Sequence, residues 1–121
     1  KKKLHDLFNL LPENVETIQF TKYVVGDSYK PHIDAFESNS IKQRKSTLII
    51  YLNENMEGGE THFNEIGLSV KPKKKMLLGF HNCIDDSNFI NPFTRHESKE
   101  IKNGEKYILS IFANDVPKYV Q

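Results

Sequence analysis

One short motif combines two side chains that bind metal ions, His32 and Asp34, separated by a single residue. In an extended strand, residues i and i+2 project from the same face about 7 Å apart, so an imidazole nitrogen and a carboxylate oxygen can converge on one ion. The motif alone is weak, because five histidines in 121 residues make such a match common by chance. The alternative is a surface histidine followed by a carboxylate that caps a loop.

A third ligand has to come from another part of the chain. The remaining histidines are His5, His62, His81 and His96. His96 is best placed, because it lies in a predicted strand, whereas His5 is predicted to lie on a helix surface. His62 points outward if its neighbour Thr61 points inward, and His81 stays open as a ligand. Two histidines and one carboxylate leave three adjacent positions of an octahedral ion open, as non-haem Fe(II) oxygenases require, so the pattern predicts oxidative chemistry.

Lys106 sharpens this prediction. An Fe(II) centre that uses 2-oxoglutarate needs a buried cation to hold the far carboxylate of that cosubstrate. Lys106 follows His96 by way of Asn103-Gly104, and an ordinary two-residue hairpin there would place His96 and Lys106 on opposite faces. The site therefore requires an odd loop length or a bulge that pairs His96 with Phe112. An outward, snorkelling lysine is the alternative for this position.

The elements that must position these residues are mostly strands. Apolar residues at helical spacing predict a short helix over residues 3–11, which ends before Pro12. From residue 15 to residue 25, polar and apolar residues alternate with a period of two, which predicts a strand. Its polar face suits a cavity wall, and its apolar face can pack against the helix. Further strands are predicted at residues 45–52, 60–63, 68–70, 76–80, 93–101 and 106–112. This pattern predicts a mainly β chain, a small β-sandwich or jelly roll.

Length and composition narrow the function classes. The chain has 121 residues, of which 37% are hydrophobic and 27% charged, and we expect one domain over residues 1–121 with its core at about 15–114. A formal net charge of +1 argues against a nucleic-acid partner. The sequence lacks an apolar run of about 20 residues, so we expect no membrane partner. The lone Cys83 excludes an internal disulfide and favours a reducing, cytoplasmic compartment.

Over about residues 16–114 these motifs resemble the prolyl 4-hydroxylase branch of the Fe(II)/2-oxoglutarate dioxygenases. The matching residues are, in chain order, Tyr23, His32-x-Asp34, Arg44-x-x-Thr47, Tyr51-Leu52-Asn53, Gly58-Gly59-Glu60-Thr61-x-Phe63, Pro72, Leu78-x-Phe80, His96 and Lys106. The resemblance implies a double-stranded β-helix, which is a jelly roll, with a short N-terminal helix. It implies that His32, Asp34 and His96 are the catalytic iron ligands.

The resemblance also implies how the other ligands bind. Lys106 is expected to pair with the C5 carboxylate of 2-oxoglutarate, and Tyr23 and Thr61 to add hydrogen bonds to it. Tyr29 and Arg44 match positions that contact the peptide around the target proline. The implied cofactor is Fe(II), the implied cosubstrates are 2-oxoglutarate and O2, and the implied reductant is ascorbate.

The activity implied by the resemblance is 4-hydroxylation of peptidyl proline. One alternative is hydroxylation of a free amino acid or another small molecule on the same scaffold, and another is a catalytically silent jelly-roll binding module. The sequence departs from the family at Glu97-Ser98-Lys99-Glu100, which replaces a small, apolar, Cys-containing run, and at Phe112, where tryptophan is common. Only one N-terminal helix is predicted where the family usually has several. These departures bear most on the substrate class, and the oligomeric state is not predicted.

Overall fold

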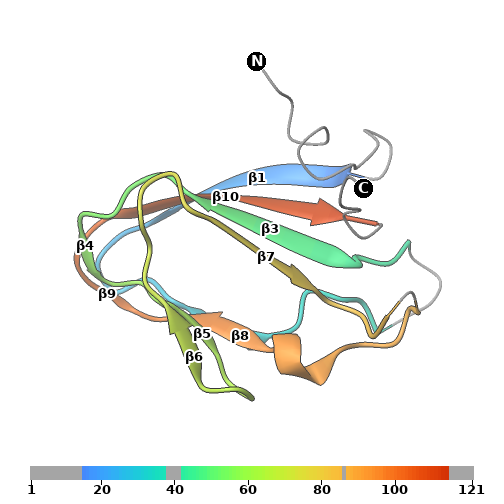
Figure 1. Cartoon of the computed structure of the whole chain (residues 1–121). Helices are drawn as coiled ribbons and strands as arrows, with labels where there is room; N and C mark the ends of the chain where they lie inside the picture. The colour runs from blue at the N-terminus through green and yellow to red at the C-terminus, as the bar shows by residue number, and fades with distance from the viewer. Residues whose placement is uncertain (1–14, 38–41, 86, 115–121) are drawn as a thin grey trace.

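The computed structural model describes residues 15–37, 42–85 and 87–114, and the predicted helix over residues 3–11 lies outside them. Two antiparallel sheets form two layers, with a strand pair at one end (Figure 1). The elements are β1 (Val15–Tyr23), β2 (Tyr29–His32), β3 (Ser46–Tyr51), β4 (Met56–Gly58), β5 (Thr61–Phe63), β6 (Leu68–Val70), β7 (Leu77–His81), η2 (Pro92–Thr94), β8 (His96–Ser98), β9 (Ile101–Gly104) and β10 (Lys106–Ala113). In this part of the chain no helix is long and apolar enough to cross a membrane.

The major sheet has the strand order β1-β10-β3-β7. Its central strands β10 and β3 are rich in isoleucine and leucine on both faces, as expected for strands that are covered from both sides. The pairing of β10 with β3 is regular from Ile108↔Tyr51 to Ala113↔Ser46. The minor sheet has the order β2-β8-β5-β6, and its strands have only three or four residues each. The jelly roll predicted from the strand pattern is confirmed.

Apolar side chains fill one part of the space between the two sheets. A buried cluster there consists of Tyr23, Ile49, Tyr51, Ile101 and Ile108. The polar face of β1 faces the same interior, since its alternate residues Gln19, Thr21 and Tyr23 line a cavity. The period-two prediction for this strand is therefore confirmed, and the cavity begins where the apolar cluster ends.

The single strand predicted over residues 93–101 is wrong. The Asn91 side chain accepts a hydrogen bond from the backbone N–H of Phe93 and starts a short 3-10 helix, because Pro92 cannot join a central strand ladder. The segment then forms two separate strands, β8 and β9, which pair with different partners. The sequence pattern also misses β2 and β4, which are short and carry little period-two alternation.

Both hairpin registers considered for His96 and Lys106 are also wrong. Asn103 and Gly104 belong to β9, which pairs with β4 rather than with β10. Gly104 has φ +79°, and a Cβ there would lie 2.6 Å from the backbone oxygen of Asn55, so this glycine allows the close approach of β4. His96 lies in the minor sheet and Lys106 in the major sheet, so the two residues come from opposite layers.

Candidate active site

All eight residues predicted to build the site line one cavity of about 410 Å³. They are Tyr23, Tyr29, His32, Asp34, Arg44, Thr61, His96 and Lys106. Strands of both sheets contribute to its wall, because β1 and β10 belong to the major sheet while β2, β5 and β8 belong to the minor sheet. The layered fold thus gathers residues that lie far apart in the sequence.

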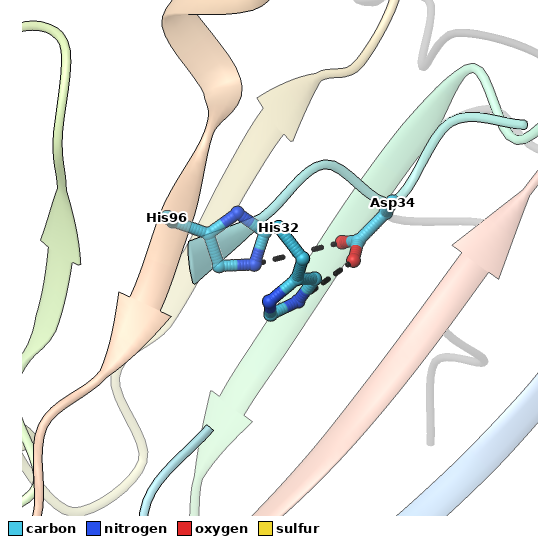
Figure 2. A group of neighbouring side chains, drawn as sticks. All are labelled: His32, Asp34 and His96. Carbon is cyan, nitrogen blue, oxygen red and sulfur yellow. Dashed lines mark ion pairs between the residues drawn. The ribbon is translucent and has the colours of Figure 1, made fainter. Parts of the chain in front are cut away.

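Three potential metal ligands converge at one end of this cavity. His32 closes β2 and pairs in register with His96, the first residue of β8, while Asp34 follows β2 (Figure 2). One ligand atom from each side chain can be chosen so that all three lie within 4.8 Å of one another. His32 Nε2 lies 3.2 Å from Asp34 Oδ1, and His96 Nε2 lies 3.8 Å from Asp34 Oδ2. His62 and His81 do not line the cavity, and His5 lies outside the described residues.

Backbone carbonyl groups fix the orientation of both imidazoles. His32 Nδ1 lies 2.6 Å from the oxygen of Lys30, and His96 Nδ1 lies 2.7 Å from the oxygen of Thr94. A carbonyl oxygen can only accept, so Nδ1 carries the proton in each neutral ring and Nε2 keeps its lone pair. Both lone pairs are therefore directed toward the carboxylate, the arrangement that metal-binding histidines adopt through their second hydrogen bond.

The charge states of the three groups suit a cation. Burial lowers the pKa of His96, which is only 5% exposed, and favours its neutral form. Burial alone would raise the pKa of Asp34, but the hydrogen bonds from His32 and Thr47 oppose it and that pKa is lowered. For His32, the hydrogen bonds to Asp34 and to the Lys30 oxygen outweigh burial and raise its pKa. In the absence of a metal ion, a proton on His32 partly neutralises the carboxylate.

The loop that carries Asp34 is anchored by a side chain that the sequence analysis did not single out. Gln43 is 5% exposed, and its amide donates to the backbone oxygens of Phe36 and Asn88. Its side-chain oxygen accepts from the N–H groups of Phe36 and Arg44. Every polar atom of this amide is therefore used to hold the loop in place.

Lys106 lies deeper in the same cavity, at the start of β10. It is 1% exposed, and its Nζ donates to the Gly59 carbonyl at 2.8 Å and to Ser98 Oγ at 2.6 Å. Its Nζ also lies 4.5 Å from the centre of the Tyr23 ring. Burial lowers the pKa of this lysine to about 8, and the charge of Glu60 opposes that effect. Two of the three ammonium protons are engaged, so one remains for a ligand.

We call the part of the cavity around His32, Asp34 and His96 the metal end and the part around Lys106 the lysine end. The distance between these two ends follows from the geometry of β8. His96 and Ser98 are residues i and i+2 of this strand, so their side chains leave the same face about 7 Å apart. Ser98 Oγ touches Lys106 Nζ, and His96 belongs to the metal end. The ammonium group is therefore placed about one strand repeat from the candidate metal position, a separation that a short dicarboxylate can span.

Further hydroxyl groups surround the lysine end. Tyr51 Oη and Thr61 Oγ1 lie 2.6 Å apart, and because only one of these hydroxyls donates in that contact, the other keeps a proton for a ligand. Burial raises the pKa values of Tyr23 and Tyr51, so both phenols stay protonated donors at neutral pH. In the sequence, Ser98 alternates with His96 at period two and belongs to a run that departs from the family, but no role at the site was predicted for it.

A glycine pair shapes this end of the cavity. At Gly58, with φ +85°, a Cβ would lie 2.1 Å from the backbone oxygen of Glu100. At Gly59, with φ +79°, a Cβ would lie 2.7 Å from the Ile101 side chain and 3.2 Å from that of Lys106. Only glycine at both positions lets the Gly59 carbonyl approach the buried ammonium group.

The mouth of the cavity carries the two residues predicted to contact a peptide. The Tyr29 ring stacks on the His32 ring with centroids 4.0 Å apart and is 54% exposed. The Arg44 guanidinium lies 4.0 Å from the centre of the Phe112 ring and binds both carboxylate oxygens of Glu16. The Phe112 ring thus supports the arginine at the position where the family commonly has a tryptophan.

The donor set fits an iron ion. Two imidazole nitrogens and one carboxylate oxygen are the donor set that non-haem Fe(II) oxygenases use, and the hydrogen-bonded Nδ1 atoms supply the second shell that such ligands require. His32, Asp34 and His96 would hold the ion, and Lys106 would face the far end of a chelating dicarboxylate. All of these groups are directed into the same cavity.

Comparison with known proteins supports this assignment. The chain is 29% identical over 114 residues to a putative prolyl 4-hydroxylase of Acanthamoeba polyphaga mimivirus, covering 87% of this chain and 47% of that protein. It is 32% identical over 130 residues to prolyl 4-hydroxylase 5 of Arabidopsis thaliana, covering 88% of this chain and 44% of that protein. The chain thus spans less than half the length of these two relatives.

Solved structures give the same result. The crystal structure of the viral collagen prolyl hydroxylase from Paramecium Bursaria Chlorella virus-1, a 2OG complex, matches with a TM-score of 0.69 and 27% identity, covering 83% of this chain and 62% of that one. A Pseudomonas putida prolyl-4-hydroxylase, 24% identical with a TM-score of 0.60, shares the fold and covers 83% of this chain and 54% of its own. The profile of the 2OG-Fe(II) oxygenase superfamily matches residues 18–114. The chain therefore belongs to the 2OG-Fe(II) oxygenase superfamily and is prolyl 4-hydroxylase-like.

Proposed function

We propose that this chain is the catalytic domain of an Fe(II)- and 2-oxoglutarate-dependent hydroxylase that acts on proline in a peptide or protein. One observation carries the proposal: two histidines and a carboxylate that converge closely enough to hold one metal ion line the same cavity as a buried ammonium group. The prolyl 4-hydroxylases among its relatives support proline as the target residue. Iron and 2-oxoglutarate, when bound, supply the oxidising chemistry that attacks an unactivated C–H bond.

The residues of the chain bind and orient these groups. His32, Asp34 and His96 hold the ion through Nε2, one carboxylate oxygen and Nε2. Lys106 donates its remaining proton to the C5 carboxylate of 2-oxoglutarate. Tyr23 and Thr61, which line the same cavity, supply neutral hydroxyl donors to the same carboxylate.

The mouth of the cavity is suited to a peptide. Tyr29 presents an exposed ring beside His32, and an aromatic surface of this kind packs well against the apolar ring of proline. Arg44, which lines the same cavity, offers a guanidinium group to peptide carbonyls. We therefore assign substrate binding to these two residues.

The test is peptide-dependent succinate formation. The protein is loaded with Fe(II) under anaerobic conditions, supplied with 2-oxoglutarate, O2 and ascorbate as the proposed reductant, and assayed with and without a proline-rich peptide. We expect the peptide to stimulate turnover and to gain the mass of one oxygen atom on proline. His32→Ala and Lys106→Ala should abolish both signals, and absence of turnover despite bound iron would contradict the proposal.

Two further variants test the substrate class. Arg44→Ala and Tyr29→Ala should reduce peptide hydroxylation while slow, peptide-independent decarboxylation of 2-oxoglutarate persists. A hydroxylase of a free amino acid would instead keep its turnover of that amino acid in both variants. The same assay on free proline separates these alternatives directly.

A further inference from the structure

A chain of two hydrogen bonds runs from the end of β7 to the candidate metal ligand Asp34. Asn82 Nδ2 lies 2.7 Å from Thr47 Oγ1, and Thr47 Oγ1 lies 2.8 Å from Asp34 Oδ2. Thr47 lies on β3 and is 1% exposed, while Asn82 follows β7 and is 0% exposed. The carboxylate is therefore connected to the centre of the major sheet by side chains that water does not reach.

The direction of both hydrogen bonds is determined by the groups involved. An ionised carboxylate only accepts, so the single hydroxyl proton of Thr47 must be donated to Asp34 Oδ2. The Thr47 oxygen can then only accept from Asn82, which must present its NH2 group. Both hydrogen bonds are therefore donated toward the carboxylate, from Asn82 to Thr47 and from Thr47 to Asp34. Each bond polarises the next.

The orientation of Asn82 has a cost in stability. Its side-chain oxygen is buried without a hydrogen-bond partner, and a desolvated, unpaired acceptor destabilises the folded state. A leucine of similar shape would avoid this penalty. An amide at this position is therefore poorly explained by packing, and its donation to Thr47 is the contact that distinguishes it from an apolar residue.

We propose that Thr47 and Asn82 are positioning residues that restrict Asp34 to binding the metal ion through one oxygen. This inference rests on the proposed function. Thr47 occupies Oδ2, which leaves Oδ1, the oxygen 3.2 Å from His32 Nε2, as the ligand atom. A carboxylate free to rotate could offer both oxygens and take a coordination position that the chelating cosubstrate needs. The hydrogen-bond chain thus protects the binding of 2-oxoglutarate as well as that of the metal.

The experiment compares matched substitutions. Thr47→Val keeps the shape and removes the hydroxyl group, Thr47→Ser keeps the hydroxyl group, and Asn82→Leu removes the donor together with the unpaired oxygen. Ser69→Ala, which removes one exposed hydrogen bond with His62 outside the cavity, is the control. Calorimetry measures Co(II) binding and then 2-oxoglutarate binding to the Co(II)-loaded protein, and thermal unfolding is recorded without metal.

We expect Thr47→Val to weaken binding of Co(II) or of 2-oxoglutarate about 10- to 100-fold, the range typical of second-shell changes. Asn82→Leu should act in the same direction with a smaller effect, yet unfold at an equal or higher temperature because the unpaired acceptor is gone. With Fe(II), both variants should form more succinate per hydroxylated peptide than the wild type. Thr47→Ser should restore binding close to the wild-type value.

Two results would overturn the inference while leaving the proposed function in place. The first is equal metal binding, cosubstrate binding and coupling in the wild type and in Thr47→Val. The second is a loss that Thr47→Ser or Ser69→Ala shares, which would show that the hydroxyl-mediated hydrogen bond to Asp34 is not its cause. A wild-type protein that binds neither Co(II) nor 2-oxoglutarate would overturn the proposed function together with this inference.

Discussion

At one end of the cavity a carboxylate lies against two imidazoles, whereas at the other end an ammonium group lies against neutral acceptors. Asp34 is within ion-pair distance of His32 and His96. Lys106 contacts a carbonyl and a hydroxyl group, and in the described part of the chain no carboxylate lies within ion-pair distance of it. Burial lowers the Lys106 pKa to about 8, while hydrogen bonds hold the Asp34 pKa below its usual range.

The difference shows that the two ends suit ligands of opposite charge. At the metal end, two imidazoles and a carboxylate converge as a cation requires, and at the lysine end a buried ammonium group is placed to pair with an anion. A metal ion chelated by a dicarboxylate supplies both at once, which explains why the same cavity contains both arrangements. Without ligands, the hydrogen-bonded carboxylate of Asp34 stabilises the fold, whereas the buried ammonium group of Lys106 destabilises it, so substitutions at the two ends should affect stability with opposite signs.

The largest effect is expected at the metal end, from Asp34→Asn. The amide keeps the size of the side chain but removes the charge that attracts the ion, so hydroxylation should fall about 1000-fold or more and metal affinity about 100-fold. The metal-free variant should also be less stable at neutral pH. The lowered Asp34 pKa stabilises the fold above the carboxyl pKa of the unfolded chain, and this stabilisation is lost as pH falls through the folded pKa.

Urea unfolding of metal-free protein at pH 7 and at pH 3 measures this contribution, and anaerobic titration with Fe(II) measures the affinity. The stability difference between wild type and Asp34→Asn should shrink at the lower pH. If the variant had the same free energy of unfolding as the wild type at pH 7, the contacts of Asp34 with the two imidazoles would contribute nothing to stability, and the prediction would be wrong.

The opposite sign is expected at the lysine end, from Lys106→Met. Loss of the cation should raise the KM for 2-oxoglutarate about 100-fold or more, because a hydrogen-bonded ion pair in a buried site is removed. The metal-free protein should nevertheless become about 2 kcal/mol more stable at pH 7. A pKa lowered from 10.5 to about 8 corresponds to a penalty of about 3 kcal/mol for burying the charge, reduced by the acceptors that methionine leaves unpaired.

The pH dependence of this gain has a defined sign. Below pH 8 Lys106 is protonated in both states and the penalty is complete. Between pH 8 and 10.5 the folded protein releases the proton while the unfolded chain retains it, so wild-type stability rises with pH and the advantage of Lys106→Met disappears. Urea unfolding at pH 7 and pH 10 tests this, with the exposed Lys102→Met as the control that should show no such change.

An intermediate effect is expected from Ser98→Ala. Ser98 orients Lys106 without carrying charge, and loss of one hydrogen bond to a charged group should raise the KM for 2-oxoglutarate about tenfold. The affinity for the metal alone should stay unchanged, although His96 is only two residues away. Calorimetry with Co(II) alone and then with 2-oxoglutarate measures the affinity for the metal and the affinity for the cosubstrate separately. A parallel loss of Co(II) binding would show that the ends of the cavity are not independent.

The sequence predicted the residues of both ends better than the arrangement that joins them. His32 and Asp34 were found from their spacing, and Lys106 from the charge that a dicarboxylate needs. The sequence placed His96 and Lys106 on one hairpin, whereas they lie in opposite sheets. An Asn-Gly pair is an equally good signal for a hairpin turn and for the close approach of a neighbouring strand, and only tertiary pairing with β4 decides between them.

Residues that act through other residues were the hardest to find. Asn82 has no spacing relation to Asp34, because their connection passes through Thr47 on a third segment of the chain. Gln43 likewise anchors a loop through contacts to Asn88, which only the folded chain brings near. Strand alternation predicts which face a residue occupies, but it does not predict which side chain of another strand it meets.

The smallest effect is expected at the mouth of the cavity, from Glu16→Gln. Glu16 holds Arg44 through both carboxylate oxygens, but the pair is partly exposed, and such pairs contribute about 1 kcal/mol or less. The Phe112 ring still supports the guanidinium group in the variant. We therefore expect the KM for a proline-rich peptide to rise about twofold to fivefold, with the KM for 2-oxoglutarate unchanged.

Steady-state kinetics with each substrate varied in turn measures this prediction. Glu105→Gln is the matched control, because it removes the carboxylate of another exposed ion pair, with Lys22, and should change neither KM. Since Glu16 touches neither end of the cavity, a change confined to the peptide KM would establish the mouth as a third, separate region. A change in the KM for 2-oxoglutarate would instead show that Arg44, through its position on the segment before Thr47, contributes to the metal end.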